Sequence, residues 1–116
     1  MKTTVYRIQD SEGRGPFKPG MSIKWLDENR TFLPDAQISE QRWIKKIADP
    51  ELHLAYVCTS IEQMKQWISK TEYARLVSLG YRFVKIEVDQ IWQLDGQAIA
   101  GRKRQYRKQA EIIKLY

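Results

Sequence analysis

The chain contains several short segments in which apolar and polar residues alternate or apolar residues run together. Segments of this kind that are rich in β-branched and aromatic residues are typical of strands. The first, Thr3–Ile8, places Val5 and Arg7 on one face and Tyr6 and Ile8 on the other. Further strands are predicted at Leu52–Cys58, Tyr81–Val88, Ile91–Leu94, Gln97–Ala100 and Ala110–Leu115.

The pattern also predicts how some of these strands are used. Leu52–Cys58 is apolar enough for a strand that is buried on both faces. The dipeptide Asp95-Gly96 is typical of a tight hairpin turn. In the last strand, alternation places Glu111, Ile113 and Leu115 on one face.

Helical signals lie between the strands. Ser60 and Ser69 each precede a Gln or Glu by three residues, the spacing of a capping box, so a helix is expected after each serine. Gly80 ends the second of these helices. A rough apolar stripe predicts another helix from Asp35 to about Ala48. The sum is a single α+β domain over residues 1–116, with a small mixed or antiparallel sheet and two to three helices.

Composition limits the class of protein. The 116 residues fit one domain, and a hydrophobic content of 42% indicates a folded chain. No apolar run approaches the roughly 20 residues of a membrane span, and the N-terminus lacks a signal-peptide core, so we expect a cytoplasmic protein with no membrane partner. Cys58 and His53 are the only residues of their types, which excludes an internal disulfide and predicts no metal site.

The formal net charge of +6 favours anionic partners. Basic residues gather near the C-terminus in the segment GRKRQYRK. Cations in such a segment can neutralise phosphates, and the tyrosine among them could stack on a base. The alternative is a solvated hairpin end. The candidate nucleic-acid contacts are Arg102, Lys103, Arg104, Tyr106 and Arg107.

The other candidate site lies near the N-terminus. Arg7 on the first strand is followed by a loop, Asp10–Gly20, that is rich in glycine and proline and carries Arg14 and Lys18. Glycines allow the backbone to approach a ligand closely, and a basic side chain could meet its anion, which makes this loop a candidate phosphate receptor. It lacks the Walker pattern. The alternatives are an exposed arginine and a plain connecting loop.

Four segments resemble the ADP-ribosyltransferase-like fold: VYRI with its glycine-rich turn, LAYVCTSIEQMKQW, GYRFVKIEVD and AEIIKL. Their order matches that fold over most of the chain. More locally, YRIQDSEGRGPFKPG is similar to the YRxxDxxGRGPxxPG opening of a family of small uncharacterised bacterial and phage proteins. This second resemblance implies no activity.

The transferase resemblance implies NAD as the cofactor. It implies that Arg7 binds NAD and that Tyr56, Thr59 and Ser60 shape the nicotinamide pocket. It also implies that Glu111 supplies the catalytic carboxylate. An arginine can meet a pyrophosphate bidentately, and a carboxylate can stabilise positive charge developing on the ribose. The sequence departs from the family pattern, because it lacks a Ser-Thr-Ser triplet and matches the Gln/Glu-x-Glu motif only loosely.

Different classes of function therefore stay open. The first is a nucleotide-binding domain that binds NAD, with or without transfer or hydrolysis of ADP-ribose. It requires Arg7, Arg14, Tyr56 and Glu111 to surround one cleft. The second is a non-catalytic phage or mobile-element accessory module that binds nucleic acid or a host protein through the basic segment. The third is a structural or toxin–antitoxin-type partner that has no ligand.

Overall fold

The computed structural model describes residues 2–16, 24–26, 44–94 and 98–116. The predicted turn at Asp95-Gly96, residue Lys18 and most of the helix predicted from Asp35 lie outside the described residues. Residues 44–47, at the end of that predicted helix, form one helical turn.

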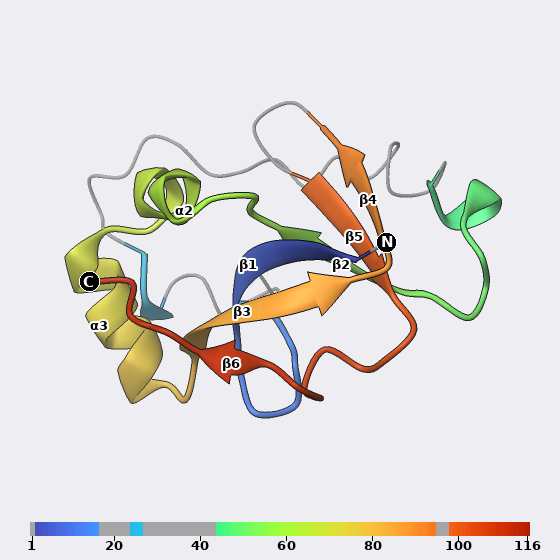
Figure 1. Ribbon diagram of the computed structural model, residues 1–116. Coiled ribbons are helices and arrows are strands. Elements are labelled where there is room, and N and C mark those ends of the chain that lie inside the picture. The colour runs from blue at the N-terminus through green and yellow to red at the C-terminus, as the bar shows by residue number, and fades with distance from the viewer. Residues whose placement is uncertain (1, 17–23, 27–43, 95–97) are drawn as a thin grey trace.

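The described strands form two antiparallel sheets of three strands each (Figure 1). This arrangement confirms the predicted α+β class. Of the two kinds of sheet predicted, mixed or antiparallel, the structure has the antiparallel kind, but it has two sheets where one was predicted. An ADP-ribosyltransferase-like fold stays a prediction. The first sheet has the order β1-β3-β6, with bounds Thr3–Gln9, Arg82–Val88 and Glu111–Ile112. The second has the order β2-β5-β4, with bounds His53–Val57, Ala98–Arg102 and Gln90–Gln93.

The two sheets are joined at two places. The backbone amides and carbonyls of Tyr6 and Cys58 exchange hydrogen bonds of 2.8 Å, which ties β1 to the end of β2. On the other side, β3 runs into β4 through Asp89, whose amide donates to the carbonyl of Gly101 on β5. These links fold the second sheet against one face of the first.

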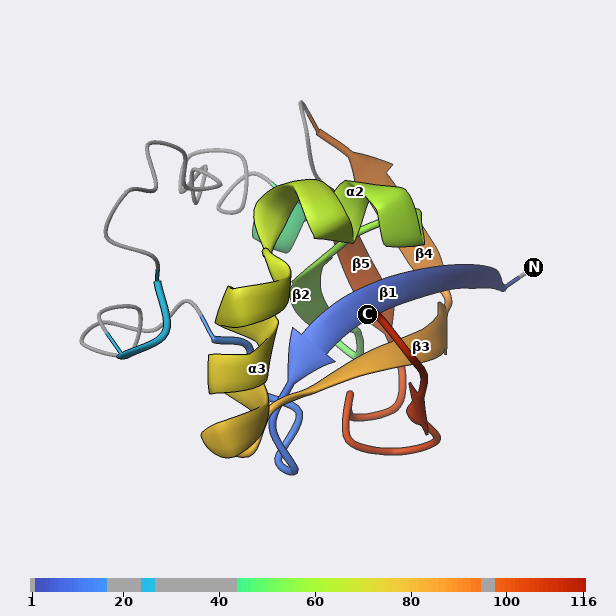
Figure 2. The ribbon, with the colours of Figure 1, turned by 90° about the vertical axis from the view of Figure 1, so that its left-hand side faces the viewer.

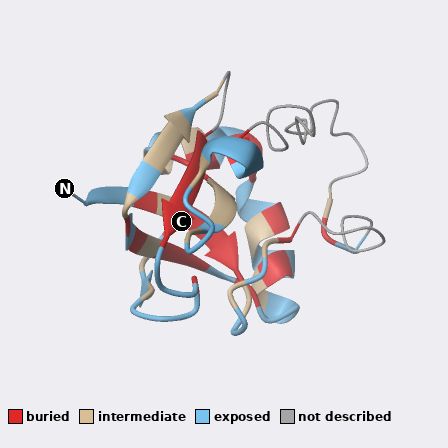
Figure 3. Cartoon of the chain, turned by 90° about the vertical axis from the view of Figure 1, so that its right-hand side faces the viewer, coloured by how far each residue is buried: buried red, intermediate tan, exposed pale blue. Residues whose placement is uncertain are grey.

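Both faces of the first sheet are covered, because its alternating side chains enter two separate apolar clusters. The cluster between the sheets contains Val5, Val84 and Val57 with their neighbours. The other cluster packs Ile8 and Phe83 against two helices, α2 (Ile61–Trp67) and α3 (Lys70–Ser78). Figure 2 shows these helices beside β1, and Figure 3 shows the buried residues concentrated on the strands and on the inner sides of the helices.

The ends of the helices confirm the capping signals of the sequence. The Ser60 hydroxyl accepts from an amide in the first turn of α2 at 3.1 Å. Ser69 and Glu72 form the complete capping box of α3. Gly80 has a φ of 96°, and the amide of the next residue, Tyr81, returns to the carbonyl of Leu76 at 3.0 Å. This is the Schellman arrangement expected of a glycine that follows a helix.

Two strand predictions are wrong in detail. The strand predicted at Leu52–Cys58 is not buried on both faces, since Val57 is the only buried residue of β2, and β2 pairs only with β5 over most of its length. The last strand is much shorter than Ala110–Leu115, because β6 contains two residues and the chain then turns so that Leu115 enters the helix-side cluster.

Candidate nucleic-acid interface

Arg7 lies inside the protein and not in an open cleft. Its side chain is 6% exposed, and its guanidinium donates to the carbonyls of Gly13 at 3.2 Å and Tyr56 at 3.5 Å. It also lies over the ring of Tyr106, 5.0 Å from the centroid. Loss of hydration on burial lowers the pKa of Arg7 to about 10, although Tyr106 and Asp10 oppose the shift. Arg7 therefore ties the N-terminal loop to the second sheet and is not open to a pyrophosphate.

The other residues assigned to an NAD pocket do not line one cleft with Arg7. Ser60 caps α2, and the amide and hydroxyl of Thr59 both donate to the Gln63 side chain, at 3.1 and 3.4 Å. Tyr56 is half-buried on β2. Arg14 is exposed, and its amide donates to the Asp10 carboxylate at 2.9 Å.

The strand register separates Arg7 from Glu111. Arg7 is paired with Val84, and Glu111 is paired with Lys85. Paired residues share a face and consecutive residues do not, so Arg7 and Glu111 lie on opposite faces of the sheet, with β3 between their strands. Glu111 is exposed and forms a 3.3 Å ion pair with Lys85. The expected approach of Arg7 and Glu111 across a pocket does not occur, and NAD chemistry stays a prediction that this geometry does not favour.

The residues Lys103–Lys108, here called the basic loop, are held from inside by Arg102. Only 4% of Arg102 is exposed. Its Nε donates to the Glu87 carbonyl at 2.9 Å, and its Nη1 donates to the carbonyls of Gln105 at 2.8 Å and Lys108 at 2.6 Å. Burial lowers the pKa of Arg102. Arg102 thus holds the basic loop near its middle, at Gln105, and at its last residue, Lys108, which the basic composition of the segment did not indicate.

Tyr106 is the second internal anchor of the basic loop. It is 7% exposed, and its hydroxyl lies 3.0 Å from the carbonyls of both His53 and Ala100. The Gln9 side chain donates to its backbone carbonyl at 2.8 Å. Burial raises the pKa of Tyr106 to about 12. Because the ring is enclosed between the sheets, Tyr106 is not placed to stack on a base as the sequence suggested.

The position of Arg102 had a signal in the sequence. Ala98 and Ala100 enter the cluster between the sheets, and Arg102 continues this alternation along β5. The four remaining cations of the segment point outward. Lys103, Arg104, Arg107 and Lys108 are all exposed.

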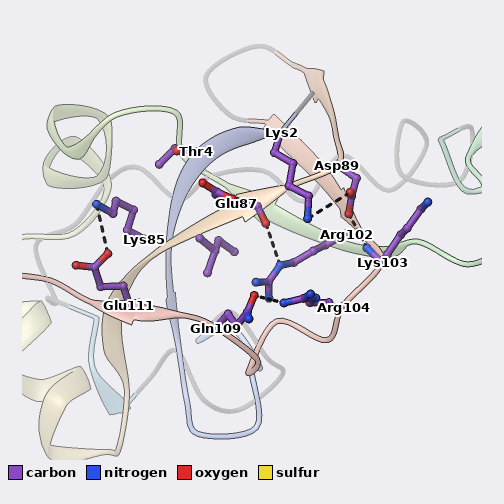
Figure 4. A pocket seen from close by; sticks show the side chains of 11 residues that line it. Lys2, Thr4, Lys85, Glu87, Asp89, Arg102, Lys103, Arg104, Gln109 and Glu111 are labelled. Carbon is purple, nitrogen blue, oxygen red and sulfur yellow. Dashed lines mark hydrogen bonds and ion pairs between the residues drawn. The ribbon is translucent and has the colours of Figure 1, made fainter.

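A hollow of about 500 Å³ opens beside the basic loop, between it and strands β3 and β6 (Figure 4). Sequence reasoning missed two of its cations, Lys2 and Lys85, although Lys85 lies on the polar face of the clearest alternating strand. Five basic and three acidic side chains contribute to its lining. The lining residues are Lys2, Thr4, Lys85, Ile86, Glu87, Asp89, Arg102, Lys103, Arg104, Gln109 and Glu111.

Two of the three acidic side chains at this hollow are already partnered. Glu111 pairs with Lys85, and Asp89 accepts from the amide of Lys103 at 2.9 Å and lies 4.0 Å from the Lys2 ammonium. The backbone hydrogen bond from Lys103 is the main cause of the lowered pKa of Asp89. The unpartnered charge around the hollow is therefore mainly positive.

A second hollow, of about 330 Å³, lies on the other side of the basic loop. Arg107 lines it together with Arg82, and Asp10 is its one acidic residue. Three of the four exposed cations of the basic loop thus line a hollow, Lys103 and Arg104 the first and Arg107 the second. No group of three or more His, Cys, Asp or Glu side chains in the described part of the chain could hold a metal ion. None of the described helices is long and apolar enough to cross a membrane.

A sequence model of the Bacteriophage T4 Y00F protein family matches residues 1–112. The chain belongs to this family. No curated protein and no solved structure matches the chain. The match agrees with the resemblance of the opening segment to phage proteins. Since it extends from the first residue to β6, it includes both internal arginines and the whole basic loop, so these belong to the part of the chain that defines the family match.

Proposed function

We propose that this member of the T4 Y00F family is a non-catalytic phage accessory module that binds nucleic acid through the basic loop. The observation that carries the proposal is that one short segment contains both buried residues that fix it and exposed cations that could contact a ligand. Arg102 and Tyr106 are buried and hydrogen-bonded to the body of the protein, while the four cations around them are exposed. A loop that is fixed in this way loses little conformational freedom when it binds a ligand.

The chemistry of the loop favours contact with the phosphate backbone. Its exposed side chains are lysines and arginines, which neutralise phosphates, and its one aromatic ring is enclosed. Without an exposed ring from Tyr106, stacking on bases does not contribute. We therefore expect binding that depends strongly on salt and little on base sequence.

The test is the salt dependence of binding to short single-stranded RNA and DNA, followed by fluorescence anisotropy. If Lys103, Arg104, Arg107 and Lys108 each neutralise one phosphate, the slope of log K against log salt is about −3. Affinity then falls roughly 50-fold between 50 and 200 mM salt. The double variant Arg104→Gln/Arg107→Gln should halve the slope and reduce the loss to roughly sevenfold.

The matched control removes the same charge from the helices. Lys65 lies on α2 and Lys70 on α3, both exposed, and Figure 1 shows these helices away from the basic loop. The variant Lys65→Gln/Lys70→Gln should keep the slope of the unaltered protein. An unchanged slope in Arg104→Gln/Arg107→Gln, or an equal reduction in the control, would contradict the basic loop as the contact.

A further inference from the structure

The hollow beside the basic loop lies where β6 has not yet begun. Glu111 and Ile112 pair antiparallel with Lys85 and Val84, and the residue before them, Ala110, does not extend this pairing to Ile86. Gln109, just before β6, has a φ of 52° and is the only residue other than glycine with a positive φ in the described part of the chain. This left-handed residue lies where the backbone leaves β3, and the exposed Glu87 lines the hollow beside it.

Arg102 forms the floor of this hollow. Its Nε and Nη1 donate to three backbone carbonyls, but no described residue accepts from Nη2. Nη2 is not among the enclosed atoms that lack a partner, so it retains some contact with solvent, and Arg102 is one of the residues that line the hollow. In Figure 4 the Arg102 side chain runs from β5 into the middle of the hollow, between Glu87 and Gln109. The side chain is therefore fixed, while one of its donors is left free for a ligand.

The rim supplies further cations around this fixed donor. Lys103 and Arg104 are exposed at one side, and Lys2 and Lys85 complete the lining. Arg104 also bonds the side chain of Gln109, which holds it at the edge of the hollow. A guanidinium of this kind binds phosphate oxygens through charge-assisted hydrogen bonds.

We propose that this hollow binds a terminal phosphate group, with Nη2 of Arg102 as the donor at its floor. A recessed donor is reached by a group that protrudes, and a phosphomonoester protrudes with three oxygens and a charge of about −1.5 to −2. The phosphates within a strand would instead contact the exposed cations of the basic loop. The same terminal group occurs on a nucleic-acid strand end and on free phosphate, and the assignment to a strand end rests on the function proposed above.

Substitution of Glu87 gives the most specific test of phosphate binding in the hollow. Its exposed carboxylate lines the hollow, and no described residue pairs with it, so it repels a phosphate there. Its backbone carbonyl, which holds Arg102, is kept when the side chain changes. Removing one negative charge about 6 Å from a phosphate in a largely aqueous setting should raise affinity roughly threefold to tenfold. The variant Glu87→Gln thus predicts a gain of binding, which a misfolded protein could not produce.

The experiment is a titration of the nitrogen-15-labelled full chain with inorganic phosphate at constant ionic strength, followed by NMR. The Nε–Hε signal of Arg102 and the amide signals of Lys103 and Glu87 should shift along one saturable curve, and Glu87→Gln should shift that curve to lower phosphate concentration. The control Glu62→Gln removes an equal charge from α2 and should leave the curve unchanged. Shifts that do not saturate, shifts spread equally over lysines of the helices, or no gain in Glu87→Gln would overturn the site.

A second arm compares oligonucleotides that carry a 5′-phosphate with the same oligonucleotides that carry a 5′-hydroxyl. Tighter binding of the phosphorylated strands, with the Arg102 signal shifted, identifies a strand end as the source of the phosphate. Equal binding of the two strands, together with saturation by inorganic phosphate, supports the site and identifies free phosphate as its ligand. Oligonucleotide binding with no change at Arg102 in either titration, with oligonucleotide or with inorganic phosphate, would overturn the hollow alone. Phosphate binding without oligonucleotide binding would overturn the proposed function alone.

Discussion

The hydroxyl of Tyr106 can be removed without removing the aromatic ring, which is enclosed between the two sheets. Phenylalanine at this position keeps the ring that lies 5.0 Å from the Arg7 guanidinium. It loses the single donor that lies 3.0 Å from the carbonyls of both His53 and Ala100. Those carbonyls belong to β2 and β5, so the Tyr106→Phe substitution tests how strongly the basic loop is fastened to the second sheet.

The expected loss follows from the burial of this hydroxyl. A net hydrogen bond contributes about 1 kcal/mol, and a buried group left without its partner raises the loss toward 2 kcal/mol. For a chain of 116 residues, the unfolding entropy is about 0.24 kcal/mol/K, so a loss of about 1 to 2 kcal/mol lowers Tm by roughly 4 to 8 °C. Total stability for this length is on the order of 6 to 17 kcal/mol, so the Tyr106→Phe variant should still fold.

The measurement is urea denaturation of Tyr106→Phe beside Tyr6→Phe. Tyr6 is half-buried and stacks on Phe83 at 5.8 Å between centroids, but no described residue bonds its hydroxyl. Tyr6→Phe should therefore change the free energy of unfolding by less than about 0.5 kcal/mol. The reasoning is refuted if Tyr106→Phe is as stable as the unaltered protein, or if the two variants lose the same amount.

Four further outcomes can be measured independently. Ser69→Ala should lower the unfolding free energy by about 1 kcal/mol in urea, because it removes the capping box of α3. Gln109→Gly should raise Tm, since glycine relieves about 1 kcal/mol of strain at a φ of 52°. Gly13→Ala should destabilise the fold by more than about 2 kcal/mol in a thermal melt, because its φ is 82° and a Cβ would lie 2.8 Å from the Arg107 nitrogen. Burial raises the pKa of the Cys58 thiol from 9.0 to about 12, so between these pH values the thiol ionises only in the unfolded state, and the free energy of unfolding falls as pH rises from 9 to 12. This contribution is at most about 4 kcal/mol. Urea denaturation of the unaltered protein and of Cys58→Ala across this pH range should show the extra loss only in the unaltered protein.

The sequence predicted the local features of the fold most accurately. Helix starts at Ser60 and Ser69 and the helix end at Gly80 depend on contacts a few residues apart, and all three are confirmed. Strand positions follow from alternation, which also placed Val5 and Arg7 on one face correctly. Alternation could not show that both faces of the first sheet are buried, because this depends on the helices that cover one face and on the second sheet that covers the other. An arginine expected at a cleft is therefore enclosed.

The candidate sites show the same limit. The basic composition of residues 101–108 was evident, but the inward direction of Tyr106 depends on partners that are 53 and 97 residues away in the chain. The meeting of Arg7 and Glu111 was inferred from the order of elements, and order does not determine register. Because β6 pairs with β3 through Lys85, one residue beyond the partner of Arg7, Glu111 lies on the opposite face.

The two internal arginines link the fold to the proposed binding. Arg7 and Arg102 both interact electrostatically with Tyr106, and neither forms an ion pair with a carboxylate in the described part of the chain. A charge surrounded by protein acts over a longer distance than one surrounded by water, and salt screens it less. A phosphate in the hollow would experience the fixed charge of Arg102 as well as the exposed cations, whereas a strand on the basic loop would experience mainly the exposed cations. Phosphate binding in the hollow should therefore weaken less steeply with salt than strand binding on the loop, which separates the two contacts in a single set of titrations.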